Sequence, residues 1–135
     1  MNKNVLSILI FALVGIAAST IIPWVKIDAF GQNQSVLGTA GDGYLTAGLL
    51  VVPLLLSILN LKSDGLGTGV FIGILIPSLI ASGIGAYDIY NLTDKMPGIS
   101  LNPFGEGIVI GSGLYLLVLS GLFITIRSFG ARNKA

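Results

Sequence analysis

The chain has 135 residues, of which 53% are hydrophobic and only 10% are charged, with a formal net charge of +1. Soluble domains carry about 25% charged residues, so a water-soluble core of this size could not hide the apolar surface, and lipid is the expected solvent. Cysteine and histidine are absent, which removes disulfides, thiolate chemistry and the commonest general base, so we expect neither a cofactor nor enzymatic activity.

Four uncharged apolar runs predict an all-α membrane protein, a bundle of four transmembrane helices in a single domain. The runs cover residues 5–22, 44–61, 67–90 and 107–126. At 1.5 Å per residue each helix is roughly 27 to 35 Å long, enough to cross a hydrocarbon core of about 30 Å. An uncleaved first helix is favoured over a signal peptide, because the apolar run is long and ends at Pro23-Trp24 without an Ala-x-Ala site.

Two long loops, residues 23–43 and 91–106, are expected to carry a small β cap. After Pro23 and Trp24 the sequence VKIDA alternates apolar and polar residues, as a half-buried strand does. Residues 35–39 are expected to return as a second strand after a turn, and residues 99–101 in the other loop to add a short third strand. Trp24 and Tyr44 are expected to anchor this end at the membrane interface.

The distribution of basic residues predicts the orientation of the chain. Five of them lie at the N-terminus, in the short loop 62–66 and in the tail 127–135: Lys3, Lys62, Arg127, Arg132 and Lys134. Only Lys26 and Lys95 fall in the two long loops. The positive-inside rule therefore predicts a multi-pass protein of the cell membrane with both termini in the cytoplasm and the β cap outside.

Trp24, just after the first predicted helix, and Gly41-Asp42-Gly43, just before the second, carry a resemblance. The chain resembles small four-helix proteins of prokaryotes, and its outline is similar to that of claudin-type tetraspan proteins. The resemblance implies four spans, both ends inside and strand character in the first outer loop. The claudin pattern of Gly-Leu-Trp followed by two cysteines is missing, so a junction-forming role is not implied.

Small residues spaced by four predict close helix packing, which lipid-embedded helices need because no hydrophobic effect drives them together. The candidate packing residues are Gly15, Gly69, Gly73, Gly107 and Gly111. This spacing favours packing within the subunit, and a dedicated face for oligomer formation is the alternative.

Three acidic residues fall near the predicted outer boundary of the membrane. Asp42, Asp88 and Glu106 could together bind a cation such as calcium, because hard cations prefer carboxylate oxygens. The favoured interpretation is that all three are solvated charges at helix ends and in loops, because no ordered metal-ligand spacing supports a cation site. Two Asn-x-Ser/Thr triplets begin at Asn33 and Asn91 on the same side, and we interpret both as coincidence, because about one such triplet is expected by chance in this composition. The scattered basic residues do not suggest nucleic-acid binding.

With so little chemistry available, the favoured hypothesis is a non-enzymatic membrane protein that acts by protein–protein contact, as an accessory subunit or scaffold. Its partners would be the lipid bilayer and other membrane protein subunits, or further copies of itself. Contacts are expected through the third and fourth helices and, outside, through Trp24, Phe30, Met96 and Phe104. The alternatives are a small oligomeric channel or transporter, and an immunity protein against a membrane-active toxin.

Overall fold

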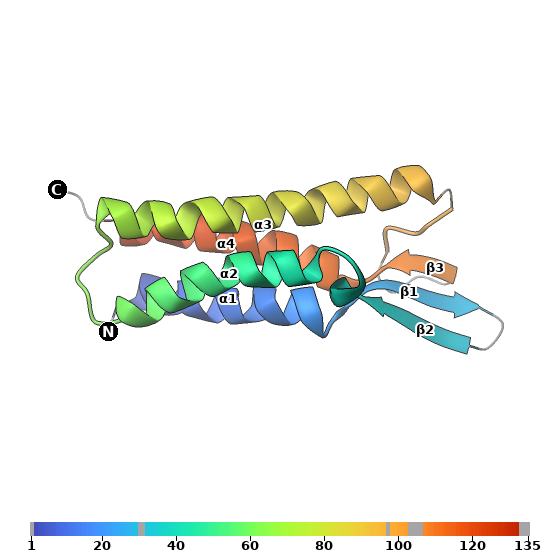
Figure 1. The fold of residues 1–135 in the computed structure, drawn as a ribbon, viewed down its shortest axis with the longest axis horizontal. Helices are drawn as coiled ribbons and strands as arrows, with labels where there is room; N and C mark the ends of the chain where they lie inside the picture. Colours follow the sequence, from blue (N-terminus) through green and yellow to red (C-terminus); the bar gives the residue numbers. More distant parts are fainter. Residues whose placement is uncertain (1, 30–31, 97, 103–106, 133–135) are drawn as a thin grey trace.

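The computed structural model describes residues 2–29, 32–96, 98–102 and 107–132. Four helices form a bundle: α1 (Lys3–Thr20), α2 (Gly43–Leu59), α3 (Thr68–Lys95) and α4 (Ser112–Ala131). Each helix packs against its neighbours in the sequence, and α1 also packs against α4, so the four close into a ring. Both ends of the chain lie at one end of the bundle and a small β-sheet lies at the other (Figure 1).

Three of these helices are long and apolar enough to cross a membrane, namely α1, α3 and α4. The remaining helix, α2, is also apolar but has 17 residues. The chain is thus a mostly helical protein with three candidate membrane spans, in agreement with the membrane character that the composition predicts.

The core of the bundle combines large aliphatic side chains, such as Ile8, Leu50 and Leu117, with small hydroxyl side chains, and the outer faces are also aliphatic. Seven Ser or Thr residues are buried: Ser19, Thr46, Ser57, Ser78, Ser82, Ser120 and Ser128. All four helices expose aliphatic residues, including Leu13, Leu55, Ile76, Ile80, Leu119 and Leu122. In water this arrangement would leave a large apolar surface unpaired, whereas in lipid an apolar exterior is favourable.

Hydrogen bonds within and between helices satisfy the buried hydroxyl groups. Thr46 Oγ1 in α2 donates to Ser19 Oγ in α1 at 2.8 Å, and Ser82 Oγ in α3 donates to the Val118 carbonyl in α4 at 2.8 Å. Among the residues that the structure describes, no buried side-chain nitrogen or oxygen lacks a partner. The core therefore combines close approach of the helices with full polar pairing, as lipid-embedded bundles require.

The β-sheet has three antiparallel strands in the order β2-β1-β3. They are β1 (Pro23–Ala29), β2 (Gln32–Leu37) and β3 (Gly107–Ile110), and Val25 in the central strand pairs with Val36 on one side and Ile110 on the other. A hairpin and a third strand are thus present, but β2 begins at Gln32 and ends at Leu37, so the predicted second strand over residues 35–39 is misplaced. The third strand is not the predicted segment 99–101, from which Ser100 alone forms a single bridge to Val109.

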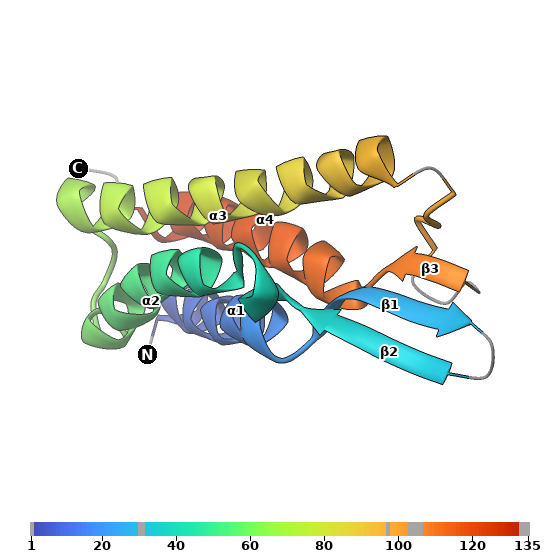
Figure 2. The ribbon, with the colours of Figure 1, turned by 45° about the vertical axis from the view of Figure 1, so that its right-hand side comes forward.

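Two of the predicted helix boundaries are wrong at the sheet end. The fourth helix begins at Ser112 and not at residue 107, because the β-branched run from Ile108 to Ile110 forms β3 between two glycines. Gly107 has a positive φ of 83°, which does not occur in a right-handed helix, and Gly111 is the extended N-cap of α4. The third helix does not end at residue 90 but continues to Lys95, and this last part of α3 runs out beyond the other helices at the sheet end (Figure 2).

Candidate functional site

Trp24 joins the helical bundle to the sheet and is not on the outer surface. Its side chain is only 6% exposed, and its indole Nε1 donates a hydrogen bond of 2.7 Å to the carbonyl of Ala18 near the end of α1. The expectation that Trp24 is an interfacial anchor and an outer contact residue is therefore wrong. Of the other expected contact residues, Met96 is half-buried at the end of α3, and Phe30 and Phe104 lie outside the described residues.

Exposed tyrosines, among them the expected anchor Tyr44, lie at the sheet end of α2 and α3. Tyr44 is the second residue of α2, at the sheet end, and is 72% exposed, and Tyr87 and Tyr90 lie in the corresponding part of α3 with exposures of 61% and 67%. Amphipathic rings of this kind suit the membrane–water interface. They indicate the level at which the apolar faces of these helices end.

The predicted packing glycines have different surroundings. A Cβ atom on Gly15 would lie 2.5 Å from Leu50 Cδ1, and one on Gly73 would lie 2.9 Å from Leu56 Cδ1, so both allow close contact with α2. Gly69 has open space around it. Gly107 and Gly111 belong to β3 and to the cap of α4, so their assignment to a helix face is wrong.

Gly111 and three glycines that the spacing did not indicate, Gly38, Gly43 and Gly113, mark a backbone junction between the helices and the sheet. Gly38 in the 3₁₀ helix η1 (Gly38–Ala40) lies against the Trp24 ring, and a Cβ atom there would be 2.5 Å from Cε2 of the indole. A Cβ atom on Gly43 would overlap the carbonyl of Ser19, and one on Gly111 would overlap the carbonyl of Pro23. A Cβ atom on Gly113 would lie 2.5 Å from the carbonyl oxygen of Ile22. Because glycine has no side chain, these positions allow the backbone of one segment to approach the backbone of another closely where the helices meet the sheet.

A cavity of about 230 Å³ opens beside this junction, between the sheet, the start of α2 and the far end of α3. Most of its wall is apolar, and its polar members are Asp42, Asp88 and Asn91. The residues that line it are Trp24, Val25, Val36, Leu37, Gly41, Asp42, Asp88, Asn91 and Leu92. Asn91, which begins one of the two Asn-x-Ser/Thr triplets, is thus a helical residue in the wall of a cavity.

Two of the three predicted acidic residues meet at this cavity. The carboxyl groups of Asp42 and Asp88 approach within hydrogen-bonding range of each other, although 46 positions separate them in the chain. Glu106, the third, lies outside the described residues. No group of three or more Asp, Glu, His or Cys that could hold a metal ion is found in the part of the chain that the structure describes.

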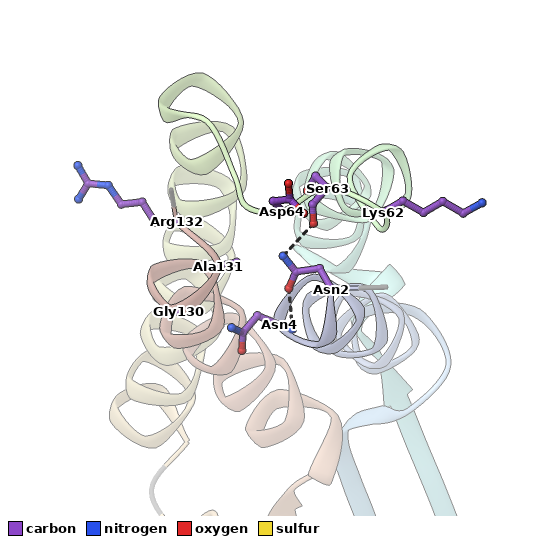
Figure 3. A pocket seen from close by; sticks show the side chains of 8 residues that line it. All are labelled: Asn2, Asn4, Lys62, Ser63, Asp64, Gly130, Ala131 and Arg132. Atoms are coloured by element: carbon purple, nitrogen blue, oxygen red, sulfur yellow. Dashed lines mark hydrogen bonds between the residues drawn. The ribbon is translucent and has the colours of Figure 1, made fainter. Parts of the chain in front are cut away.

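A second, polar cavity of about 390 Å³ lies at the opposite end, where the two termini meet the α2–α3 loop (Figure 3). Asn2 is its centre: Nδ2 donates to the Ser63 carbonyl at 3.3 Å, and Oδ1 caps α1 by accepting from the backbone N–H of Asn4 at 3.1 Å. The charged side chains of Lys62 and Arg132 point away from the cavity in opposite directions (Figure 3). The guanidinium carbon of Arg132 lies 5.2 Å from the centre of the Phe71 ring.

These contacts hold the chain ends and the α2–α3 loop together. The backbone N–H of Leu66 donates to the Ala131 carbonyl at 2.8 Å, and that of Asn2 donates to the Leu61 carbonyl at 2.8 Å. The polar groups of this cavity therefore serve the fold. The sequence matches no protein-family model, and no curated protein or solved structure is significantly similar to it.

Proposed function

We propose that the protein is a four-span integral membrane protein that acts by contact with other membrane-spanning helices, as an accessory subunit or scaffold without chemistry of its own. One observation carries the proposal. Three glycines on the outer faces of α2 and α3, Gly48, Gly69 and Gly83, have nothing within 4 Å of the position that a Cβ atom would take. No described part of the same chain packs against these three positions.

The assignment of α2 as a fourth span rests on its position and surface. The helix of 17 residues is about 25 Å long, slightly shorter than a hydrocarbon core, and it packs between α1 and α3. No charged residue occurs between Asp42 and Lys62, and Val51, Val52 and Leu55 are exposed on its outer face. A helix with this surface, held between two candidate spans, is suited to lipid and not to water.

The proposed orientation places both termini in the cytoplasm and the sheet outside. Lys3, Lys62, Arg127 and Arg132 lie at the end of the bundle where the chain begins and ends (Figure 1). Lys26 and Lys95 lie at the sheet end, together with four of the acidic residues, Asp28, Asp42, Asp88 and Asp94. This distribution follows the positive-inside rule and supports the orientation.

Introduced cysteines test this orientation in a chain that has none of its own. Ser35→Cys in β2 and Lys62→Cys in the α2–α3 loop replace exposed side chains at opposite ends. A membrane-impermeant maleimide added to intact cells should label Ser35→Cys, and it should label Lys62→Cys only after permeabilisation. Labelling of both variants in intact cells, or the reverse pattern, would contradict the proposed topology.

The open glycines, Gly48, Gly69 and Gly83, differ from the glycines that pack against another helix of the bundle. Gly15, Gly73 and Gly121 each face a neighbouring helix of the same chain, and a Cβ atom on Gly121 would lie 2.6 Å from Ser82 Cβ. Gly48 and Gly83 lie among exposed aliphatic side chains instead, and glycine in a helix interior is about 1 kcal/mol less favourable than alanine. A partner helix that packs closely against these positions would compensate for this cost.

Bulky substitutions at the open glycines test the contact hypothesis. We expect Gly48→Leu and Gly83→Leu to reduce several-fold the fraction of protein that keeps a partner subunit or a second copy after gentle extraction, because the added side chain prevents close approach. Native mass spectrometry of protein from its own membranes measures this fraction and the stoichiometry. Leu79→Ile, an aliphatic exchange at an exposed position of α3, is the matched control.

Two outcomes would contradict the proposal. The first is recovery of the wild-type protein only as a monomer without a partner subunit, which would show that it forms no stable contact in the membrane. Equal partner retention in the wild type and in both leucine variants would show that the outer glycine positions are not where the contact forms. Far-UV circular dichroism should be the same for all variants, since neither leucine meets another part of the chain within 4 Å of its Cβ atom.

A further inference from the structure

We propose that the cavity at the sheet end binds a small organic ammonium ion. The cavity is formed by β1, β2, the turn before α2 and the outer part of α3, so its walls come from segments that are distant in the sequence. It combines mostly apolar walls with a few polar groups that converge on one place, which is the usual composition of a small-molecule site.

The two acidic side chains that line the cavity favour a positively charged ligand. Asp42 and Asp88 both line it and approach each other within hydrogen-bonding range, and Asp88 is half-buried. None of the described lining residues is a Lys or Arg, so no basic side chain among them neutralises the pair. Two carboxyl groups this close repel each other when both are ionised, and an ammonium ion that donates hydrogen bonds to both would offset that repulsion.

The walls favour an organic cation over a metal ion. Calcium takes six to eight oxygen ligands, whereas the polar side chains at this cavity are two carboxylates and the amide of Asn91. The remaining wall includes Val25, Leu37 and Leu92, which offer no ligand atoms to a metal but can contact an alkyl group. Trp24 also lines the cavity, and tryptophan is the aromatic side chain with which cations interact most strongly.

The size and position of the cavity limit the ligand. A volume of about 230 Å³ is below the range of about 300 to 1,000 Å³ for sites that hold drug-sized molecules, so the occupant is small. The exposed Tyr87 and Tyr90 on the same part of α3 place the cavity near the level expected for the lipid headgroups. Both a free amine and the amine headgroup of a phospholipid supply the required chemistry.

The single tryptophan of the chain provides a direct measurement, because Trp24 lines the cavity. The full-length protein is reconstituted in nanodiscs of phosphatidylglycerol, which has no amine, and its fluorescence is followed during titration with n-butylammonium chloride. We expect a saturable change in Trp24 emission. The Asp42→Asn, Asp88→Asn double variant should raise the apparent Kd at least tenfold, whereas Asp94→Asn, on an exposed side chain of α3 outside the cavity, should not change it.

Nanodiscs that contain phosphatidylethanolamine distinguish the two sources of the amine. If the headgroup occupies the cavity, Trp24 emission in these discs already matches the saturated value, and if a free amine is required, the titration is the same in both lipids. Either result supports the site. Circular dichroism checks the fold of the double variant, and Asp42→Asn alone, at an exposed position, serves the same comparison if the double variant does not fold.

Three results would overturn the proposal. The first is a wild-type titration in phosphatidylglycerol discs without saturation. The second is a response that does not depend on charge: either neutral n-butanol gives an equal response, or the Asp42→Asn, Asp88→Asn variant responds as the wild type does. Either observation would show partition into lipid and not binding to the carboxylates. The third is a saturable response to calcium chloride at lower concentration than to n-butylammonium, which would assign the cavity to a metal ion.

Discussion

Replacing Trp24 with alanine should destabilise the protein more than any other substitution of a single side chain at the sheet end. The indole is buried between α1, η1 and the start of the sheet, and removing a buried Trp or Phe side chain lowers the free energy of unfolding by about 3–5 kcal/mol. The hydrogen bond from Nε1 to the Ala18 carbonyl is also lost. Thermal and denaturant unfolding in detergent micelles, followed by far-UV circular dichroism, measures the change.

Two further variants separate packing from hydrogen bonding. Trp24→Phe keeps an aromatic ring in the space but leaves the Ala18 carbonyl without its donor, which should lower the free energy of unfolding by about 1–3 kcal/mol. Tyr44→Ala removes an aromatic side chain that is 72% exposed, and its effect should be much smaller. Similar losses for Trp24→Ala and Tyr44→Ala would show that the indole is not a structural contact of the folded protein.

Trp24 shows where sequence reasoning reaches its limit. A tryptophan after an apolar helix fits an interfacial anchor, because composition and position are the same for a ring that faces the membrane surface and for one that turns inward. The buried position depends on the Ala18 carbonyl and on Gly38, which lies 14 residues later and has no side chain to displace the indole. No local pattern contains this information.

The misplaced start of the fourth helix has a different cause. Hydrophobicity alone does not distinguish a buried strand from a helix segment, and the run from Gly107 to Ile126 is uninterrupted by charge. The β-branched residues between Gly107 and Gly111 were the available signal for a strand. The alternation in PWVKIDA was easier to interpret, because polar residues on one face reveal the period of two, and that strand was predicted correctly.

The acidic residues illustrate what topology alone provides. Four antiparallel helices place the start of the second and the end of the third at the same level, so Asp42 and Asp88 were expected near one boundary. The close approach of their carboxyl groups depends on side-chain direction and on how α3 packs against α2, which no spacing rule predicts. The cavity between them and the sheet depends in addition on the unexpected length of α3.

Substitution of Gly43 by alanine tests the backbone junction that joins the two parts of the fold. A Cβ atom at this position would overlap the Ser19 carbonyl and the backbone of Gly38, and neither can move aside as a flexible side chain would. We therefore expect Gly43→Ala to lower the free energy of unfolding by about 1–3 kcal/mol, the range for overpacking a well-filled core. The same unfolding experiment in micelles measures it.

The matched control for Gly43→Ala is Gly48→Ala in the same helix. Gly48 has nothing within 4 Å of a Cβ position, so alanine there adds no clash and replaces a residue that costs a helix about 1 kcal/mol. The two substitutions are chemically identical and five residues apart, and they should change stability in opposite directions. Equal effects would mean that helix propensity decides both, and the close approach of η1 and α1 to the start of α2 would then not limit the residue at position 43.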